Sequence, residues 1–133
     1  MRTHKTLMLV VLALILTFVA SLAFAGGHGG KKAHEAVIIE GVHIPEGYEC
    51  NGASVPSPLW PLIGTPFDPR FLPAAFYHDR VYETGELPRK DGDKGFRKVL
   101  IHNGVDENLA QTMYYGVRVG GAAHYNKGGH KAR

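Results

Sequence analysis

Three side chains that can do proton or metal chemistry, His78, Asp79 and Tyr82, lie close together in the sequence, and Asp93 follows early in the next periodic segment. On a helix, His78 and Tyr82 share a face because they are four residues apart, whereas Asp79 points in another direction. An imidazole can act as a general base near neutral pH, and a carboxylate that accepts its N–H fixes which ring nitrogen stays open. A carboxylate that points elsewhere suits a hard cation. These residue types therefore indicate a hydrolytic or metal-binding site.

The sequence around these residues predicts two helices joined by a short turn, followed by a third helix. Asp68 is a favourable N-cap with a proline directly after it, and a Thr-Gly pair ends the pattern, so a helix is expected over residues 69–84. A second helix is expected over residues 90–102, with an Asn-Gly pair as its stop. Asp106 caps the third, over residues 107–119.

The short connection between the first two helices sets their relative direction. A link of this length returns the second helix antiparallel to the first. Asp93, early in the second helix, would then lie across from His78 or Tyr82. Phe96 follows three residues later on the same face and would shelter the pair from water.

The part of the chain before these helices has the pattern of extended structure. Residues 36–40 are rich in β-branched side chains, and residues 41–48 form a second extended piece with a turn at Pro45 and Gly47. Three prolines within residues 51–61 exclude a regular helix or a central strand there. The expected fold is therefore α+β and mainly helical, with short N-terminal strands packed on an antiparallel helix pair and a third helix.

Residues 1–25 have the pattern of a secretory signal peptide. Arg2 and Lys5 form a short basic start, an apolar run follows, and Ala23 and Ala25 fit a cleavage site before Gly26. The alternative is an uncleaved N-terminal anchor, because residues 6–25 are long enough for a membrane span of about 20 residues. We therefore expect an exported protein, periplasmic or secreted, or one anchored by its N-terminus.

The remaining chain divides into a linker, one domain and a tail. Residues 26–35 are polar and glycine-rich and read as a flexible linker. Residues 36–125 are expected to form a single globular domain, and residues 126–133 a flexible basic tail. The lone cysteine, Cys50, excludes a disulfide framework within the chain, and we expect it to be buried.

The charge of the mature chain argues against a nucleic-acid partner. The sequence has 15 Lys and Arg against 12 Asp and Glu, but Arg2 and Lys5 leave with the signal peptide, so 13 basic and 12 acidic residues remain. A nearly neutral domain has no basic surface for a phosphate backbone.

The spacing His-Asp-x-x-Tyr from His78 to Tyr82, followed by Asp-x-x-Phe from Asp93 to Phe96, resembles the catalytic helix pair of secreted phospholipases A2, including those of viral capsids. The resemblance implies that His78 is the general base for a water molecule. It also implies that Asp93 orients His78 and that Tyr82 is a hydrogen-bond partner of Asp93. The reaction implied is hydrolysis of a lipid ester.

The same resemblance implies a calcium ion. Asp79 would be its carboxylate ligand, and backbone oxygens of the loop before the first helix would complete the site. The corresponding residues 62–67 contain a single glycine, Gly64, where the phospholipases have several. Calcium would polarise the ester carbonyl as a Lewis acid.

A further resemblance covers more of the chain. The sequence contains the motifs N-G-A-S-V-P, L-W-x-L-I-G-x-P-F, A-A-x-x-H-D-x-x-Y, D-x-x-F and Y-x-x-V-R-x-G, spread over residues 44–120. Together they resemble a phage and prophage family known as domain of unknown function 1353. This resemblance implies no particular activity.

Several other interpretations of the same residues stay open. The His-Asp-x-x-Tyr group can be a hydrogen-bond network that only ties helices together. A metal-dependent phosphohydrolase would need further histidine ligands, for which His102 and His124 are available. Ser54 lacks the strand-turn-helix context of a nucleophile and more plausibly holds its loop. Tyr114 and Tyr115 could add a phenol to the Asp93 network or belong to the core.

The expected function is that of an exported phage- or prophage-type protein that attacks a lipid ester in the bacterial envelope. Its partners would be an envelope lipid or an envelope protein, and exposed Trp60, Phe67, Phe71 or Leu72 could contact a lipid surface or belong to the core. The alternative is a non-catalytic envelope protein with a structural or interaction role, in which the His, Tyr and Asp cluster is a packing network.

Overall fold

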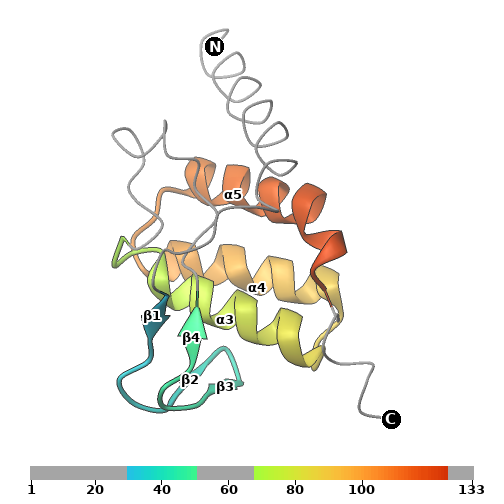
Figure 1. Ribbon diagram of the computed structural model, residues 1–133. Coiled ribbons are helices and arrows are strands. Elements are labelled where there is room, and N and C mark those ends of the chain that lie inside the picture. The colour runs from blue at the N-terminus through green and yellow to red at the C-terminus, as the bar shows by residue number, and fades with distance from the viewer. Residues whose placement is uncertain (1–29, 51–67, 126–133) are drawn as a thin grey trace, which may run out of the picture.

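The computed structural model describes residues 30–50 and 68–125 (Figure 1). Its helices are α3 (Leu72–Thr84), α4 (Arg89–His102) and α5 (Glu107–Gly120), followed by the short 3-10 helix η3 (Gly121–Ala123). Its strands are β1 (Lys31–Lys32), β2 (Val37–Ile39), β3 (Val42–Ile44) and β4 (Glu49–Cys50). The prediction of a mainly helical α+β fold is confirmed. The proposed signal peptide, residues 51–61 and the proposed tail lie outside the described residues.

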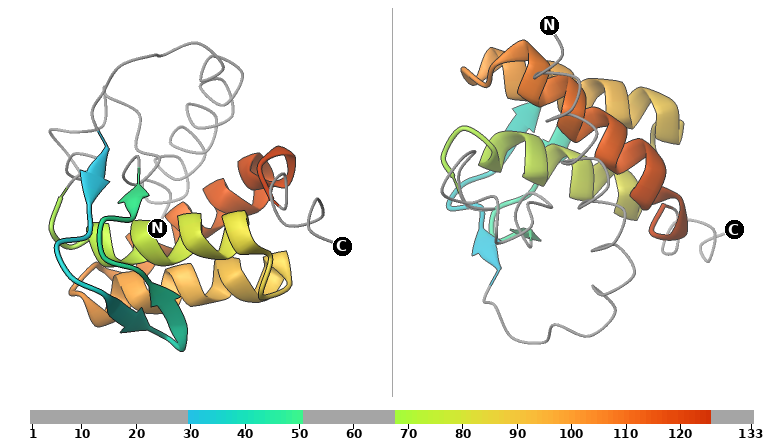
Figure 2. Two further views of the ribbon diagram at one scale, coloured as in Figure 1. Left: turned by 60° about the horizontal axis from the view of Figure 1, so that its bottom comes forward. Right: turned by 90° about the horizontal axis from the view of Figure 1, so that it is seen from above.

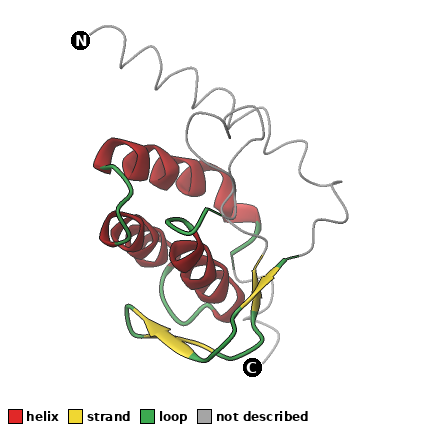
Figure 3. Ribbon diagram, turned by 90° about the vertical axis from the view of Figure 1, so that its left-hand side faces the viewer, coloured by secondary structure: helices red, strands yellow, loops and turns green. Residues whose placement is uncertain are grey.

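Helix α4 is the central helix of the three. It packs on α3 along one side and on α5 along another. Successive helices run in opposite directions, since each short connection turns the chain back (Figure 1). Figure 3 shows the helices in red with the strands in yellow on one side of them. A side chain on α4 can therefore be reached from both outer helices, and this is the position of Asp93.

Two glycines allow α3 and α4 to approach each other closely. A side chain at Gly92 would run into Val81, and a side chain at Gly95 would run into the ring of Tyr77. Glycine within a helix costs about 1 kcal/mol relative to alanine. Here that cost is offset by the close packing of Val81 and Tyr77, both of which are buried.

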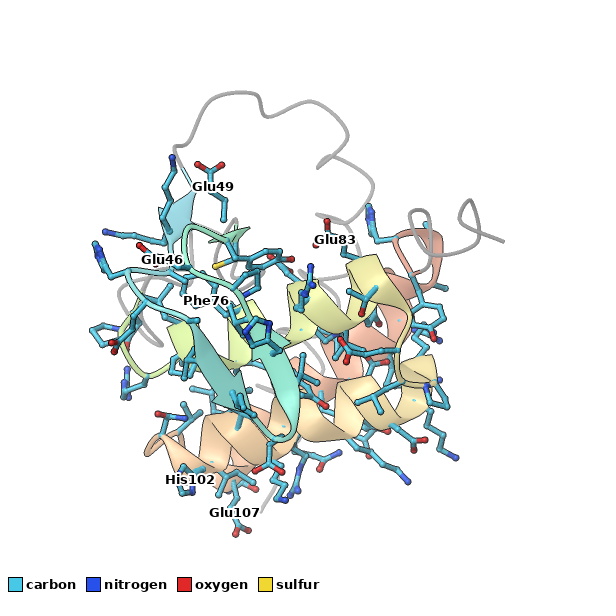
Figure 4. The ribbon with its side chains drawn as sticks, turned by 90° about the horizontal axis from the view of Figure 1, so that it is seen from below. Glu46, Glu49, Phe76, Glu83, His102 and Glu107 are labelled. Carbon is cyan, nitrogen blue, oxygen red and sulfur yellow. The ribbon has the colours of Figure 1, made fainter. Side chains whose placement is uncertain are left out.

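The strands form two small antiparallel pairs on one side of α3. β2 pairs with β3 in the register Val37↔Ile44, Ile38↔His43 and Ile39↔Val42, and β1 pairs with β4. Because side chains alternate along a strand, Val42 and Ile44 both point inward and are buried. Figure 2 shows these strands lying against α3, and Figure 4 shows Phe76 of α3 beside them.

The sequence predicted extended structure in residues 36–48, and β2 and β3 confirm it. The turn expected at Pro45 and Gly47 is also present, with Gly47 at a φ of 76° and Tyr48 donating to the carbonyl of Pro45. The predicted flexible linker over 26–35 differs from the structure at its end. Lys31–Lys32 is strand β1, and the amide of Ala33 donates to the carbonyl of Tyr48.

The core lies between the three helices and the strands. Among the described residues, Phe71 and Tyr77 are the largest fully buried side chains. Phe71 is therefore a core residue and not part of an exposed lipid-contacting patch. Cys50 is buried as predicted. Trp60 and Phe67 lie outside the described residues.

The first helix begins later than the sequence predicted. Helix α3 starts at Leu72, with Phe71 at the N-cap position and no side-chain cap, instead of starting at Pro69. The carboxylate of Asp68 instead accepts from the amide and the guanidinium of Arg70. The prediction failed because Pro73 has no N–H to donate to the carbonyl of Pro69, and a proline is tolerated only in a first turn.

The other predicted helix ends agree with the structure. Gly85 ends α3 in the left-handed conformation, with φ at 64°. The Asp106 side chain caps α5 by accepting from the amides of Asn108 and Leu109. Among the described residues, no helix is long and apolar enough to cross a membrane.

Candidate functional site

Asp93 is the centre of the candidate site. Its side chain is fully buried, with 0% exposure, and it is the fifth residue of α4. Oδ1 accepts hydrogen bonds from the hydroxyl of Tyr82 at 2.6 Å and from Nε2 of His78 at 2.7 Å. Oδ2 accepts a hydrogen bond from Nη1 of Arg118 at 2.6 Å. A buried carboxylate needs such partners, because an unpaired charge in the interior is strongly unfavourable.

His78 is held on three sides. Its ring lies 4.0 Å from the ring of Tyr82 and 4.9 Å from the ring of Phe96, measured between centroids. An ionised carboxylate only accepts, so Nε2 carries the proton that is shared with Asp93. Nδ1 makes no hydrogen bond to any residue in the described ranges, and 12% of the side chain is exposed. The ring is thus fixed in orientation with one nitrogen open.

The structure brings together three residues that the sequence singled out, namely His78, Tyr82 and Asp93. Phe96 lies against His78 as expected, and it is buried. The antiparallel pairing of α3 and α4 produces this arrangement, because one turn separates His78 from Tyr82 on α3 and both face α4.

The sequence analysis did not identify two arginines of the site, Arg89 and Arg118. Arg118 on α5 binds Oδ2 of Asp93, and Nη1 of Arg89 lies 3.6 Å from the same oxygen. Arg89 also donates to the backbone carbonyls of Val117 and Arg118 at the end of α5. A signal was available for Arg118: it belongs to the Y-x-x-V-R-x-G motif and interrupts the otherwise apolar side of the third predicted helix.

Electrostatics keep Asp93 ionised. Burial by itself would raise the pKa of Asp93, but the hydrogen bonds from His78, Tyr82 and Arg118 outweigh burial and hold this pKa below its ordinary value. Burial, together with the hydrogen bond to Asp93, raises the pKa of Tyr82. Tyr82 therefore stays a neutral donor to an anionic acceptor.

Tyr125 and Gly121 pack against Tyr82. Tyr125 packs edge-on against it at 5.3 Å between centroids, and the Tyr125 hydroxyl donates to the carbonyl of Leu87. Gly121 lies beside the Tyr82 hydroxyl, and a side chain there would occupy the position of the phenol. The short α3–α4 connection and the end of α5 thus fix Tyr82 in place.

Of the two predicted calcium ligands, Asp79 and Gly64, the structure describes only Asp79. Gly64 lies outside the described residues. Asp79 is a partly buried residue of α3. Burial raises the pKa of the Tyr48 hydroxyl, and the nearby carboxylates of Glu83 and Asp79 raise it further. No group of three or more His, Cys, Asp or Glu suited to a metal ion occurs within residues 30–50 and 68–125. Since calcium takes six to eight oxygen ligands, a calcium site at Asp79 would need further ligands from outside these ranges or from backbone oxygens.

Of the residues behind the other interpretations, those that the structure describes lie outside the hydrogen bonds of Asp93. His102, at the end of α4, and His124, after η3, are exposed, and Ser54 lies outside the described residues. Tyr115 is largely exposed. Within the part of the chain that the structure describes, neither Tyr114 nor Tyr115 donates a hydrogen bond to Asp93.

An apolar groove lies apart from His78. Its volume is about 590 Å³, and it runs between the β2–β3 hairpin and the ends of α3 and α4 that lie far from Asp93. Ile38, which is 69% exposed, Phe76 and His102 are among the residues that line it. Figure 4 labels Phe76 and His102. Leu72, one of the residues expected to contact lipid or core, also lines this groove. Most of the residues that line the groove are apolar.

A sequence model of the family described as "Protein of unknown function (DUF1353)" matches residues 32–117. This chain belongs to that family. The match confirms the family predicted from the motifs. It includes His78, Tyr82, Arg89 and Asp93, and ends one residue before Arg118.

Curated relatives of this DUF1353 protein include two from Sinorhizobium fredii. The uncharacterized protein y4jT is 35% identical over 74 residues, which cover 56% of this chain and 22% of y4jT. The uncharacterized protein y4iH is 26% identical over 69 residues, which cover 52% of this chain and 29% of y4iH. The matched region thus spans less than a third of either relative. No solved structure matches the chain.

Proposed function

We propose that this protein is an exported, phage- or prophage-type hydrolase of lipid esters in the bacterial envelope, with His78 as its general base. The observation that carries the proposal is the 2.7 Å contact of His78 Nε2 with Oδ1 of Asp93. No residue in the described ranges occupies Nδ1. The contacts of Asp93 with His78 and Tyr82 also match those that the phospholipase A2 resemblance implies.

The chemistry follows from the two ring nitrogens. Nδ1 takes a proton from a water molecule as the water oxygen attacks the ester carbonyl carbon. The imidazolium that forms is stabilised by the Asp93 carboxylate at Nε2. Nδ1 then returns the proton to the leaving alkoxide as the ester C–O bond breaks. The products are a carboxylic acid and an alcohol, and the base is restored.

The neighbours of His78 suit this role. Phe96 and Tyr82 pack on the ring and limit its rotation, so Nδ1 keeps one direction. Tyr82 also occupies Oδ1 of Asp93 as a second donor, which lowers the tendency of the carboxylate to take the proton itself. Fixed orientation of a base contributes directly to rate, because it removes the entropy of positioning.

A lipid is the substrate class that the remaining features favour. The groove along the β2–β3 hairpin is lined mostly by apolar side chains, which suits an acyl chain. Calcium is part of the proposal through Asp79, and the ion would supply Lewis-acid polarisation of the carbonyl when bound. Gly64 stays a proposed contributor to that site.

The test is release of fatty acid from phospholipid vesicles by purified protein, comparing wild type, His78→Ala and His43→Ala. His43 is an exposed histidine of β3 outside the Asp93 cluster, so it controls for loss of a histidine alone. The proposal requires activity in wild type and His43→Ala and none in a folded His78→Ala. Absence of hydrolysis by folded wild type, with and without calcium, contradicts it.

A second candidate function is favoured by one observation. Asp93 receives donors from α3 and α5 while it belongs to α4, so a single carboxylate ties all three helices together. A network of this kind serves a non-catalytic envelope protein equally well. In that case His78→Ala lowers stability, and every loss of function follows the loss of folded protein.

A further inference from the structure

The Asp93 cluster holds more positive than negative charge. Two guanidinium groups, those of Arg118 and Arg89, face one carboxylate oxygen, Oδ2 of Asp93. Arginine remains protonated in proteins, so one carboxylate neutralises only one of the two. Asp93 is also the one carboxylate among the groups that raise the pKa of Arg118. Among the described residues no second carboxylate pairs with either arginine, so the cluster that holds His78 has an excess of one positive charge.

Both arginines are partly open to solvent. The exposed fraction of the side chain is 27% for Arg118 and 21% for Arg89. Within the described part of the chain, Arg118 uses Nη1 alone, for Asp93. A guanidinium has five N–H donors in a rigid fork. Arg118 therefore has further donors for a ligand.

The arrangement is held before any ligand arrives. The Asp93 carboxylate anchors Arg118 from its buried side, and the backbone carbonyls of Val117 and Arg118 anchor Arg89. A long side chain normally loses rotamer freedom when it binds a ligand. Here much of that rotamer freedom is already lost before binding, which favours affinity for an anionic ligand.

We infer that Arg118, with Arg89, binds a phosphate-type oxyanion next to His78. The planar fork of arginine matches the oxygen spacing of a phosphate and binds it with two parallel hydrogen bonds. The ligand is the phosphate of a lipid headgroup or free phosphate, and both share this chemistry. The choice of a lipid headgroup rests on the proposed function, in which the substrate is a lipid ester, and on the carboxylate that Arg118 and His78 share.

Binding is tested first without any catalysis. Inorganic phosphate is titrated into the full-length wild-type protein at constant ionic strength, and NMR follows the arginine side-chain N–H groups and the His78 ring. We expect saturable shifts of Arg118, Arg89 and His78. Because this experiment uses wild type, it does not depend on the folding of a variant. No saturable shift at these residues, or equal shifts at Arg70, overturns the inference.

Variants then assign the donor. We expect Arg118→Gln to weaken phosphate binding by about tenfold or more, since a charge-assisted hydrogen bond contributes about 1.5–3 kcal/mol. Arg118→Lys keeps the charge but not the fork and should bind with intermediate strength. Arg70→Gln is the matched control, because Arg70 is also a partly exposed arginine paired with one aspartate. Unchanged affinity in a folded Arg118→Gln contradicts the inference.

The source of the phosphate is separated by two further probes. Glycerophosphocholine and phosphatidylglycerol vesicles carry phosphodiesters, whereas inorganic phosphate does not. Tighter binding of the phosphodiesters identifies a lipid headgroup, and tighter binding of inorganic phosphate identifies free phosphate. Hydrolysis of a neutral nitrophenyl acyl ester tests His78 without any phosphate. Ester hydrolysis without phosphate binding would overturn this inference alone, and phosphate binding without hydrolysis of any ester would overturn the proposed function alone.

Discussion

His78 and Tyr82, one turn apart on α3, both reach the same oxygen of Asp93, at 2.7 and 2.6 Å. The shared acceptor fixes the imidazole through Nε2 and the phenol through its hydroxyl at once. Their rings lie 4.0 Å apart between centroids, so the position of one constrains the position of the other. The stability of the site and its proposed chemistry therefore depend on the same contacts.

Removal of the Tyr82 hydroxyl should lower stability. Tyr82→Phe leaves the buried Asp93 carboxylate with one donor fewer on Oδ1. We expect the free energy of unfolding to fall by about 1–3 kcal/mol, the usual cost of an unmet buried polar group. Denaturant titration measures it. Tyr115→Phe is the control, because Tyr115 is 45% exposed, and an equal loss in both variants would contradict the role of Tyr82.

Gly121 should be intolerant of alanine because of Tyr82. Its φ of −79° is open to any residue, so the obstacle is the phenol and not the backbone. We expect Gly121→Ala to cost about 1–3 kcal/mol through overpacking. The hydroxyl is the nearest atom, so the same change should cost less in Tyr82→Phe. Additive losses in the double variant would show that the two residues do not press on each other.

Acid should weaken the fold through Asp93. The pKa of Asp93 is lower in the folded protein than its ordinary value, so its contribution to stability is complete above the unfolded pKa of about 3.9. That contribution is lost as the pH falls below about 4 through the lowered folded pKa. Unfolding curves over this range should fall steeply for wild type and less steeply for Asp93→Asn.

Asp68→Asn provides the comparison for this pH dependence. The hydrogen bond from Arg70 lowers the pKa of Asp68 as well, but this pair lies at the surface and is screened by water. The slope below about pH 4 should therefore change less in Asp68→Asn than in Asp93→Asn. The reverse order would mean that Asp93 is not the group that dominates acid sensitivity.

Calcium binding should depend on Asp79. We expect saturable heat of calcium binding in wild type by calorimetry and its loss in Asp79→Asn, because an amide lacks the charge that a hard cation needs. Asp91→Asn, at an exposed position of α4, controls for the loss of one negative charge. Binding that survives Asp79→Asn unchanged would remove Asp79 from the site.

The helix pair, and the position of Asp93 across from His78 or Tyr82, could be predicted because both rest on local spacing. The hydrogen bond between Tyr82 and Asp93 was implied only by the resemblance to phospholipases A2. His78 and Tyr82 follow helical periodicity, and a short connection fixes the direction of α4. The start of α3 was missed because Asp68 and Pro69 form a start signal that Pro73 overrides. Rules based on local sequence do not say whether the start signal at Asp68 and Pro69 or the proline at position 73 decides where the helix begins.

The arginines could not be predicted for a different reason. Arg118 reaches Asp93 across 25 residues of sequence, and Arg89 reaches the end of α5 across 28. Such contacts depend on how three helices pack together, and helical periodicity alone does not specify that packing. An arginine on an apolar helix side was the available sign, since a charge there needs a buried partner.

The most direct test of the central claim is the rate of fatty acid release by His78→Ala relative to wild type, at equal concentrations of folded protein. Loss of a general base lowers a rate by about 10²–10⁴-fold. The account predicts a loss of that size with His43→Ala unaffected. Hydrolysis by folded His78→Ala at the wild-type rate would contradict the account and leave His78, Tyr82 and Asp93 as a structural network.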